Sequence, residues 1–192
     1  MKKGARTKQQ MLDTAMTLFQ RQGYHGTGLN QVLAESEAPR GSLYFHFPGG
    51  KEQLAAEAVA ESGRQMCELI EAVLAQSDDP PAAVSAIIDS FVALLEESDF
   101  QRGCPVATVA LEATVDSADV RSACDGAYGS WLRVLESRFA DWGIPGDRAG
   151  ELAAVALSML EGALLLARVQ QDVTVLRTVG GQLAALLESA RS

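Results

Sequence analysis

Residues 23–54 read GYHGTGLNQVLAESEAPRGSLYFHFPGGKEQL, and this stretch decides how the whole sequence is interpreted. Thr27 is a favoured N-cap residue, so the run after it predicts a short helix. Residues 36–38 are typical of a tight turn, and Pro39 suits the first turn of another short helix, where its missing N–H costs nothing. That helix should end around Phe47. A helix, a tight turn and a further short helix form the helix-turn-helix pattern.

Helical periodicity continues on both sides of this stretch. Residues 11–19 carry apolar side chains at helical spacing, and Gly23 follows as a stop signal. Asp147 and Asp172 are the expected caps of the last two helices, and no run alternates at the period of a strand. We therefore expect an all-α fold of about nine helices, six of them after residue 50. These six cover approximately residues 51–76, 84–95, 106–113, 120–142, 148–169 and 172–187.

Charge is distributed unevenly along the 192 residues. Residues 1–51 hold seven basic and three acidic residues, a net charge of +4, whereas the remainder holds nine and 22, a net charge of −13. The total of −9 argues against a protein that coats nucleic acid without sequence preference. A basic head on an acidic body instead indicates an anionic partner for the head alone.

The helix after the turn offers side chains that suit a DNA major groove, which is about 12 Å wide. Arg40 can make a bidentate contact to guanine or phosphate, Gly41 lets the backbone approach closely, and Ser42 can bond a base edge or a phosphate. Tyr44 and His46 would donate from the rim. Further phosphate contacts are expected from Thr27 and Gly28, with the N–H groups that follow them, and from Lys51.

Other roles for these side chains stay open from the sequence. Tyr44 and His46 could form hydrogen bonds within the fold instead of contacting DNA. The basic residues between positions 2 and 8 fit a solvated N-terminus and a DNA-contacting arm equally well. Three apolar residues of the helix after the turn are expected in the core of the head: Leu43, Phe45 and Phe47.

The same stretch resembles the DNA-binding signature of TetR-family transcriptional regulators. The matching positions are Gly23-Tyr24, Thr27, Gly41-Ser42-Leu43-Tyr44, Phe45, His46-Phe47 and Lys51. The runs APRGSLYFHFPGGKEQL (38–54), GCPVATVALEAT (103–114) and LEGALLLAR (160–168) are similar to the LmrA/YxaF-type subgroup. The chain departs from the family pattern at Glu37, where a turn glycine is usual, and at Pro39, where serine is usual. The resemblance implies a DNA-binding repressor that responds to a ligand.

The resemblance also implies two domains, a helix-turn-helix domain at 1–50 and a helical ligand-binding and dimerisation domain at 51–192. The implied partners are a palindromic operator in double-stranded DNA, a small-molecule effector and a second copy of the chain. The homodimer would form through the last two helices, about Arg148–Val169 and Val173–Ala190; alternatively, the first of these is only the core helix of a monomer. Candidates for the effector pocket, each of which suits a plain core position equally well, are Phe91, Phe100, Cys104, Thr108, Tyr128, Trp131 and Met159.

Catalytic, metal-binding and membrane-spanning functions find little support in the sequence. Residues 49–51 lack the features of a phosphate loop, no HExxH occurs, and Cys67, Cys104 and Cys124 are too scattered for a zinc cluster. Glu161 interrupts the longest apolar stretch, so we expect a cytoplasmic protein without a membrane span. Glu112 also lies in an apolar run, where a carboxylate needs a partner. We predict no enzymatic activity, metal or cofactor; an all-α enzyme and an architectural DNA-binding protein without an effector are the rival hypotheses.

Overall fold

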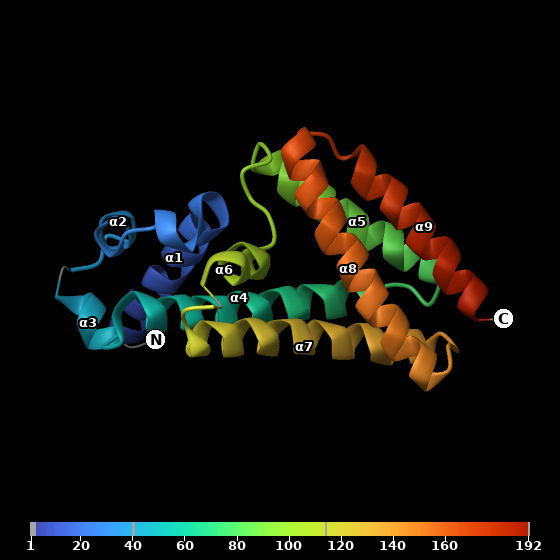
Figure 1. Cartoon of the computed structure of the whole chain (residues 1–192), viewed down its shortest axis with the longest axis horizontal. Helices are drawn as coiled ribbons and strands as arrows, with labels where there is room; N and C mark the ends of the chain where they lie inside the picture. Colours follow the sequence, from blue (N-terminus) through green and yellow to red (C-terminus); the bar gives the residue numbers. More distant parts are fainter. Residues whose placement is uncertain (1–2, 40, 114, 192) are drawn as a thin grey trace. The chain divides into compact units, whose positions relative to one another are not determined.

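The computed structural model describes residues 3–39, 41–113 and 115–191, and within these ranges the chain forms helices and no strand (Figure 1). The expectation of an all-α fold with about nine helices is confirmed for the described residues. In chain order the helices are α1 (Lys3–Gly26), α2 (Leu29–Glu35), α3 (Ser42–His46), α4 (Gly50–Leu74), α5 (Pro80–Glu97), α6 (Pro105–Ala113), α7 (Ala118–Asp141), α8 (Gly146–Gln170) and α9 (Thr174–Ala190).

The helices pack into two compact units. Unit 1 comprises Met1–Arg64 and Cys104–Ala127, and unit 2 comprises Gln65–Gly103 and Tyr128–Ser192. Two helices, α4 and α7, contribute residues to both units. The packing units thus differ from the expected functional division at residue 50, which stays a prediction.

Unit 1 is built around α1, which packs against α2, α3 and α6. The inward face of α1 is fully buried at Met11, Ala15 and Phe19, together with Leu54 of α4 and Val109 of α6. Each large apolar side chain that is fully buried stabilises the fold by roughly 1.5–3 kcal/mol relative to its exposed state. The first 50 residues alone would form a thin core, so α6 supplies apolar surface that the head needs.

The start of α2 differs from the sequence prediction. Gly28, not Thr27, is the N-cap residue of α2, and it offers no side-chain hydrogen bond. Thr27 is 1% exposed, and its hydroxyl donates to the Gly23 carbonyl oxygen at 2.8 Å. The prediction that Thr27 caps α2 is therefore wrong, because its side chain instead closes the kink at Gly23, where the backbone leaves helical geometry (φ 79°, ψ 173°).

The starts of α3, α8 and α9 also differ from the prediction: the N-cap residue of α9 is Val173, and Asp172 precedes it. Pro39 precedes α3, which begins at Ser42, and Asp147 lies inside the first turn of α8. An acidic residue there still interacts favourably with the helix dipole. Asp172 accepts hydrogen bonds from the backbone N–H and hydroxyl of Thr174 at 2.8 and 2.7 Å, and these bonds lower the pKa of its carboxyl group.

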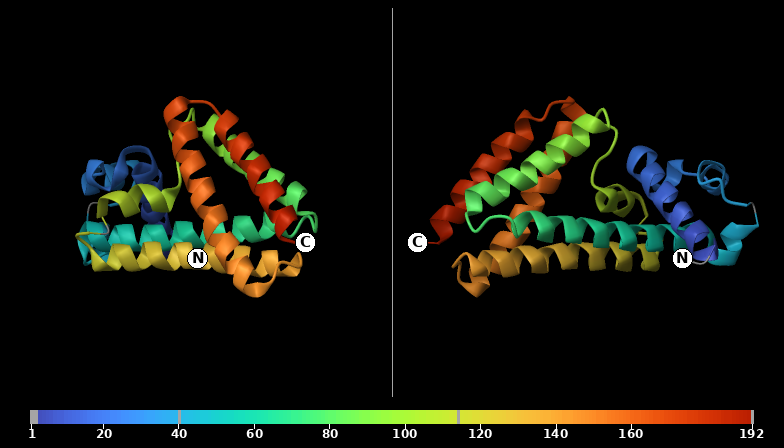
Figure 2. Two further views of the ribbon diagram at one scale, coloured as in Figure 1. Left: turned by 45° about the vertical axis from the view of Figure 1, so that its right-hand side comes forward. Right: turned by 180° about the vertical axis from the view of Figure 1, so that it is seen from behind.

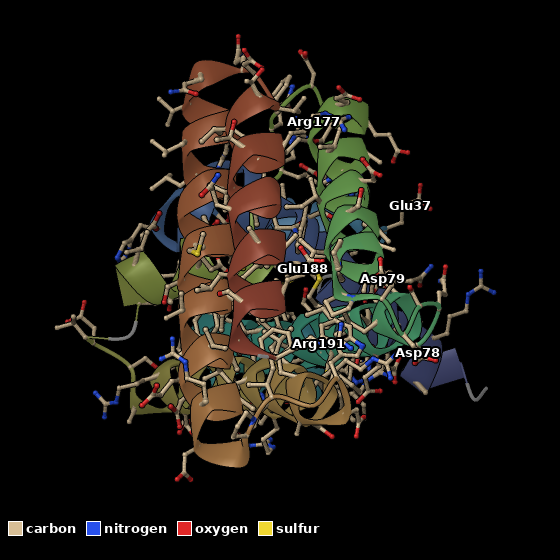
Figure 3. All side chains as sticks on the ribbon, turned by 90° about the vertical axis from the view of Figure 1, so that its right-hand side faces the viewer. Glu37, Asp78, Asp79, Arg177, Glu188 and Arg191 are labelled. Carbon is tan, nitrogen blue, oxygen red and sulfur yellow. The ribbon has the colours of Figure 1, made fainter. Side chains whose placement is uncertain are left out.

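In unit 2, α9 lies against both α5 and α8 (Figures 2 and 3). The approach of α9 to α5 requires a glycine, because a Cβ at Gly180 would lie 2.6 Å from Cγ1 of Ile88. Arg177 pairs with Asp89 of α5 at 3.2 Å, and Nε of Arg191 donates to the backbone oxygen of Trp142 at 2.9 Å. Figure 3 shows the two arginines near opposite ends of α9, so polar contacts supplement the apolar packing along its length.

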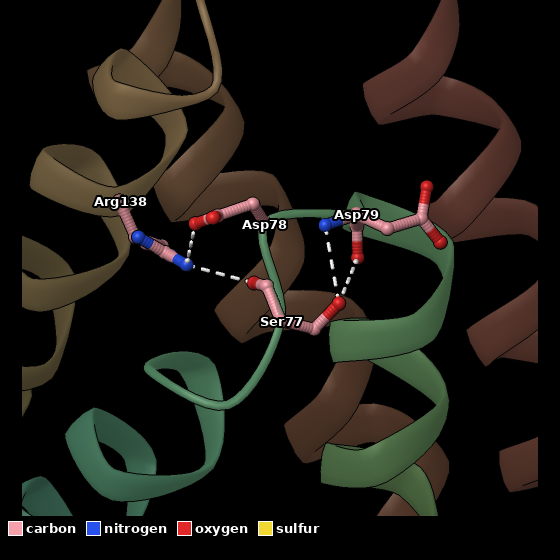
Figure 4. Close-up of polar contacts among 4 residues, drawn as sticks. All are labelled: Ser77, Asp78, Asp79 and Arg138. Carbon is pink, nitrogen blue, oxygen red and sulfur yellow. Dashed lines mark hydrogen bonds and ion pairs between the residues drawn. The ribbon is translucent and has the colours of Figure 1, made fainter.

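Polar groups hold the connection between α4 and α5 (Figure 4). Asp79 is the N-cap residue of α5 and accepts from the N–H of Ala82 at 3.1 Å, so α5 begins at Pro80, four residues before the expected range. Arg138 of α7 donates through Nη2 to the Ser77 carbonyl oxygen at 2.7 Å and to Oδ1 of Asp78 at 2.9 Å. The Asp78 side chain is 97% exposed, so the bond to the Ser77 carbonyl is the better shielded of the two.

Among the described helices, α8 alone is long and apolar enough to span a membrane by length and composition. One stripe of it is buried within unit 2, at Leu152, Ala156, Leu160, Ala163 and Ala167. These positions recur at intervals of three and four residues, which is the pattern of a core helix with one covered face.

Candidate nucleic-acid interface

The short helix α3 has one buried and one exposed face. Leu43 and Phe47 are fully buried, as expected, because positions four apart share a helix face and this pair faces the core of unit 1. Phe45 was expected in the same core, and this prediction is wrong: its side chain is 80% exposed. Tyr44 is 65% exposed beside it, and Gly41 is exposed too. The outward face of α3 therefore carries Gly41, Tyr44 and Phe45.

The start of α3 is open to a partner. A Cβ at Gly41 would meet no atom within 4 Å, so the backbone at Gly41 can approach another molecule closely. The backbone N–H of Ser42 donates to the Pro39 carbonyl oxygen at 2.8 Å, and its half-exposed hydroxyl donates to the same oxygen at 2.6 Å. A contact from Ser42 to DNA would use the hydroxyl as an acceptor or break this local bond. Arg40 lies outside the described residues, so its contact stays a prediction.

The turn between α2 and α3 has a left-handed backbone at Glu37, where φ is 53°. The N–H of Ala38 donates to the Leu33 carbonyl oxygen, and that of Glu37 donates to the Ala34 carbonyl oxygen. This pair of bonds forms the Schellman motif that ends many helices, usually with glycine at the left-handed position. A side chain at this position carries backbone strain that glycine would avoid.

Lys51 of α4 and His46 of α3 each lie beside an aromatic ring. Nζ of Lys51 is 4.5 Å from the centroid of the Tyr24 ring, and burial lowers the pKa of Lys51 while the Glu112 carboxylate partly opposes that shift. The half-buried His46 ring meets Phe45 edge-on at 4.9 Å between centroids. Both residues are thus held by packing near the start of α4. Gly28 is exposed with open space around it, whereas the buried Thr27 hydroxyl is already bonded within the chain.

Glu112 of α6 bonds the end of α1, a contact that the sequence did not predict. Its Oε2 accepts from the backbone N–H of His25 at 2.8 Å, and Nε2 of His25 lies 3.2 Å from the Glu112 carbonyl oxygen. A Cβ at Gly23 would overlap the same carboxylate, since Cδ of Glu112 lies 2.8 Å from that position. The only sequence signal was the carboxylate in an apolar run. This contact fixes α6 to the segment that leads into the helix-turn-helix.

The effector-pocket candidates divide between the two units. Cys104 and Thr108 belong to unit 1, where the Thr108 hydroxyl donates to the Cys104 carbonyl oxygen at 3.1 Å. In unit 2, Trp131 is buried and meets the half-buried Tyr128 edge-on at 5.2 Å. The other candidates of unit 2 are half-buried: Phe91, Phe100 and Met159. A pocket formed by these residues stays a prediction.

Unit 2 also has an open groove between α4 and α7, with a volume of about 530 Å³. Its lining includes Cys67, Glu71, Arg133 and Arg138, and none of the effector-pocket candidates. Within the part of the chain that the structure describes, no three His, Cys, Asp or Glu side chains gather to hold a metal ion.

Comparisons with protein families match both parts of the chain. The model described as bacterial regulatory proteins, tetR family, matches residues 11–58. The model described as transcriptional regulator LmrA/YxaF-like, C-terminal domain, matches residues 80–182, which is more than half of the chain.

Relatives of known name match over nearly the full length. The chain is 37% identical to the HTH-type transcriptional regulator LmrA of Bacillus subtilis, covering 95% of this chain and 97% of that protein. It is 36% identical to the uncharacterized regulator YxaF of the same organism, covering 94% and 95%. Among solved structures, the regulatory protein TetR from Rhodobacter sphaeroides superposes with a TM-score of 0.82 at 20% identity, covering 92% of this chain and 96% of that one. A TetR-family regulator from Streptomyces coelicolor gives 0.82 at 22% identity, covering 98% and 97%.

Proposed function

The chain belongs to the TetR family of bacterial transcriptional regulators, with an LmrA/YxaF-like C-terminal domain, and we propose that it is a repressor that binds a palindromic operator as a homodimer and is released by a small-molecule effector. The family consists of DNA-binding regulators and not of enzymes. The proposal places the protein in the cytoplasm, where its operator would be.

The observation that carries the DNA-binding part is the outward face of α3. A Cβ at Gly41 would meet no atom within 4 Å, and the Tyr44 side chain beside it is exposed. Residues 1–51 carry a net charge of +4, whereas the rest of the chain carries −13. Because DNA would repel the acidic part, this distribution favours a binding mode in which only the basic head touches phosphate.

Dimer formation is supported by the exposed faces of α8 and α9. On α8, four apolar residues outside the buried stripe are exposed: Val155, Leu165, Leu166 and Val169. Gly162 of α8 and Gly181 of α9 are exposed, and a Cβ at either would meet no atom within 4 Å of the same chain. Small residues at such positions allow the close approach of a partner helix, as in helix bundles.

Release by an effector needs a connection between the ligand-binding helices and the head. α4 begins directly after the helix-turn-helix and runs into unit 2, so a shift of α4 would move α3 of each protomer. The bond between Glu112 and His25 would pass a movement of α6 to the end of α1. Changing the separation of two α3 helices would misplace both half-site contacts.

The first test selects DNA from a randomised duplex library with the full-length protein and footprints the selected duplex. We expect a palindromic site, and we expect Tyr44→Phe to weaken its binding by about 5- to 150-fold, because one hydrogen bond to phosphate is lost in each of the two half-sites. Leu69→Ala, a change at an exposed position in unit 2, serves as the control and should leave binding unchanged. A protein that selects no sequence would contradict the regulator function.

The second test adds lipophilic cations and neutral aromatic drugs, chosen because the body is acidic, to the complex with the selected duplex. A compound that binds the free protein and releases the duplex supports the repressor proposal. Trp fluorescence identifies the compounds that bind the protein. If these compounds leave the affinity for the operator unchanged, the proposed coupling between effector binding and DNA binding is wrong, and an architectural role is favoured.

The third test concerns the dimer. Gly162→Arg and Gly181→Arg should each shift the sedimentation coefficient towards that of a monomer and abolish operator binding, because each places a charged side chain where a partner helix would lie. Ala93→Arg on the exposed side of α5 adds the same charge elsewhere in unit 2 and should leave the dimer intact. Dimers that persist in both glycine variants would exclude this face as the interface.

A further inference from the structure

Phe45 is an apolar side chain held out in solvent. The other five phenylalanines of the chain are buried or half-buried, whereas Phe45 is 80% exposed. A single exposed apolar residue needs no explanation by itself. Its position does need one, because it lies on the outward face of α3 that is proposed to meet DNA.

Phe45 lies on the same face of α3 as the residues at the start of the helix. Residues three and four apart share a helix face, so Phe45 follows Gly41 and Ser42 on one side. Leu43 and Phe47 occupy the opposite side and are fully buried. A surface close enough to meet the exposed backbone of Gly41 would therefore also meet the phenyl ring.

The phenyl ring is supported on one side. The His46 ring meets it edge-on at 4.9 Å between centroids, and His46 is itself half-buried. The remaining surface of the ring is open to solvent. The Phe45 side chain is therefore partly ordered in the free protein, which lowers the entropy cost of binding DNA.

A phenyl group can recognise only an apolar feature of DNA, because it neither donates nor accepts a conventional hydrogen bond. In the major groove, the base pairs differ in one apolar group, the 5-methyl group of thymine, and phenylalanine is among the side chains that contact it. A wedge between base steps is the alternative use of an exposed phenylalanine, but such wedges enter from the minor groove. Because α3 exposes Gly41 and Tyr44 together with Phe45, it fits the major groove instead.

We infer that Phe45 contacts the 5-methyl group of a thymine in each operator half-site and makes the protein prefer thymine at that position. This specificity rests on the proposed DNA-binding function. Removing one methyl group from such a contact lowers affinity about fourfold, and removing it from both half-sites of a palindrome lowers affinity about fifteenfold. Because Phe45 is uncharged, the dependence of affinity on salt concentration should not change.

The experiment replaces each thymine of the selected duplex, one symmetric pair at a time, by deoxyuridine, which pairs in the same way but lacks the methyl group. Wild-type protein should lose about fifteenfold in affinity at one pair of positions. Phe45→Ala should bind the thymine duplex as weakly as wild type binds the deoxyuridine duplex at that pair, and should no longer distinguish the two. Phe45→Leu keeps an apolar side chain and should retain part of the discrimination.

The outcomes separate this inference from the proposed function. If wild-type protein binds its selected site with no loss at any deoxyuridine pair, the inference is overturned while the regulator function stands. If Phe45→Ala weakens thymine and deoxyuridine duplexes equally and still discriminates between them, the methyl contact belongs to another residue. If wild-type protein selects no duplex, the proposed function itself fails. Unchanged thermal unfolding of Phe45→Ala, expected because the ring is exposed, excludes misfolding.

Discussion

Replacing Gly23 by alanine should destabilise the protein strongly although the new side chain is a single methyl group. The backbone at Gly23 (φ 79°, ψ 173°) lies in a region that only glycine occupies readily, and strain of this kind costs about 1–3 kcal/mol. The added Cβ would also overlap the Glu112 carboxylate, whose Cδ lies 2.8 Å from that position. Moving the carboxylate away breaks its bond to the His25 N–H, which costs about 1 kcal/mol more.

The expected loss is about 2–4 kcal/mol in the free energy of unfolding, or about 5–15 °C in the thermal midpoint. Urea unfolding at one fixed protein concentration measures it, since dimer formation makes stability depend on concentration. Gly26→Ala is the matched control, because a Cβ there would meet Gln22 only at 3.7 Å, an ordinary contact. It should change stability by less than about 0.5 kcal/mol.

A double-mutant cycle tests the cause. Glu112→Ala alone should cost about 1 kcal/mol, because the His25 N–H loses its acceptor. Once Gly23 has been replaced, that bond is already broken, so Glu112→Ala should cost almost nothing further. Additive losses would refute the steric argument, and a Gly23→Ala variant as stable as the wild type would refute the backbone argument as well.

Three further predictions concern stability. Glu37→Gly should stabilise the protein by about 0.5–1 kcal/mol in urea unfolding, because glycine relieves the left-handed backbone, whereas Glu37→Ala should not. Arg138→Met should lower the free energy of unfolding by about 1–3 kcal/mol, since it removes the donor to the shielded Ser77 carbonyl oxygen. Asp78→Asn, which changes the exposed partner of Arg138, should lower it by less than about 0.5 kcal/mol. Equal losses in the two variants would contradict this ranking. Burial raises the pKa of the Cys124 thiol from 9.0 to about 11, so folding favours the protonated thiol. Its contribution to the free energy of unfolding should be complete below pH 9 and lost as the pH rises towards 11. In urea unfolding curves measured over a pH series, Cys124→Ala should remove this decrease in stability between pH 9 and 11.

Most of the fold could be predicted because it is encoded in short-range patterns. Apolar spacing located the helices of the described residues, although α5 begins at Pro80, capped by Asp79, four residues before the expected range of 84–95. Leu43 and Phe47 were placed correctly in the core, since their spacing puts them on one face. The starts of several helices, α2, α3, α5, α8 and α9 among them, were misplaced by a few residues, because several neighbouring residues have similar capping preferences.

The candidate site was predicted in its residue types and only partly in its geometry. Tyr44 was expected at the surface and is exposed there, whereas Phe45 was assigned to the core on its apolar character alone. In a helix of five residues, two inward positions suffice to close the core, and the third apolar side chain faces out. Thr27 fits a capping pattern in sequence, yet the kink at Gly23 brings a carbonyl oxygen to its hydroxyl and buries it.

The sequence by itself determined the class of the fold, the helix-turn-helix, the basic head on an acidic body and the family, because each depends on residues close together along the chain. Only the tertiary structure decided that Glu112 bonds His25, 87 residues away, and that α6 completes the core around α1. It also decided which side of α3 faces solvent. Such contacts depend on which helix faces meet when apolar surface is buried, and helical periodicity within one segment leaves that choice open.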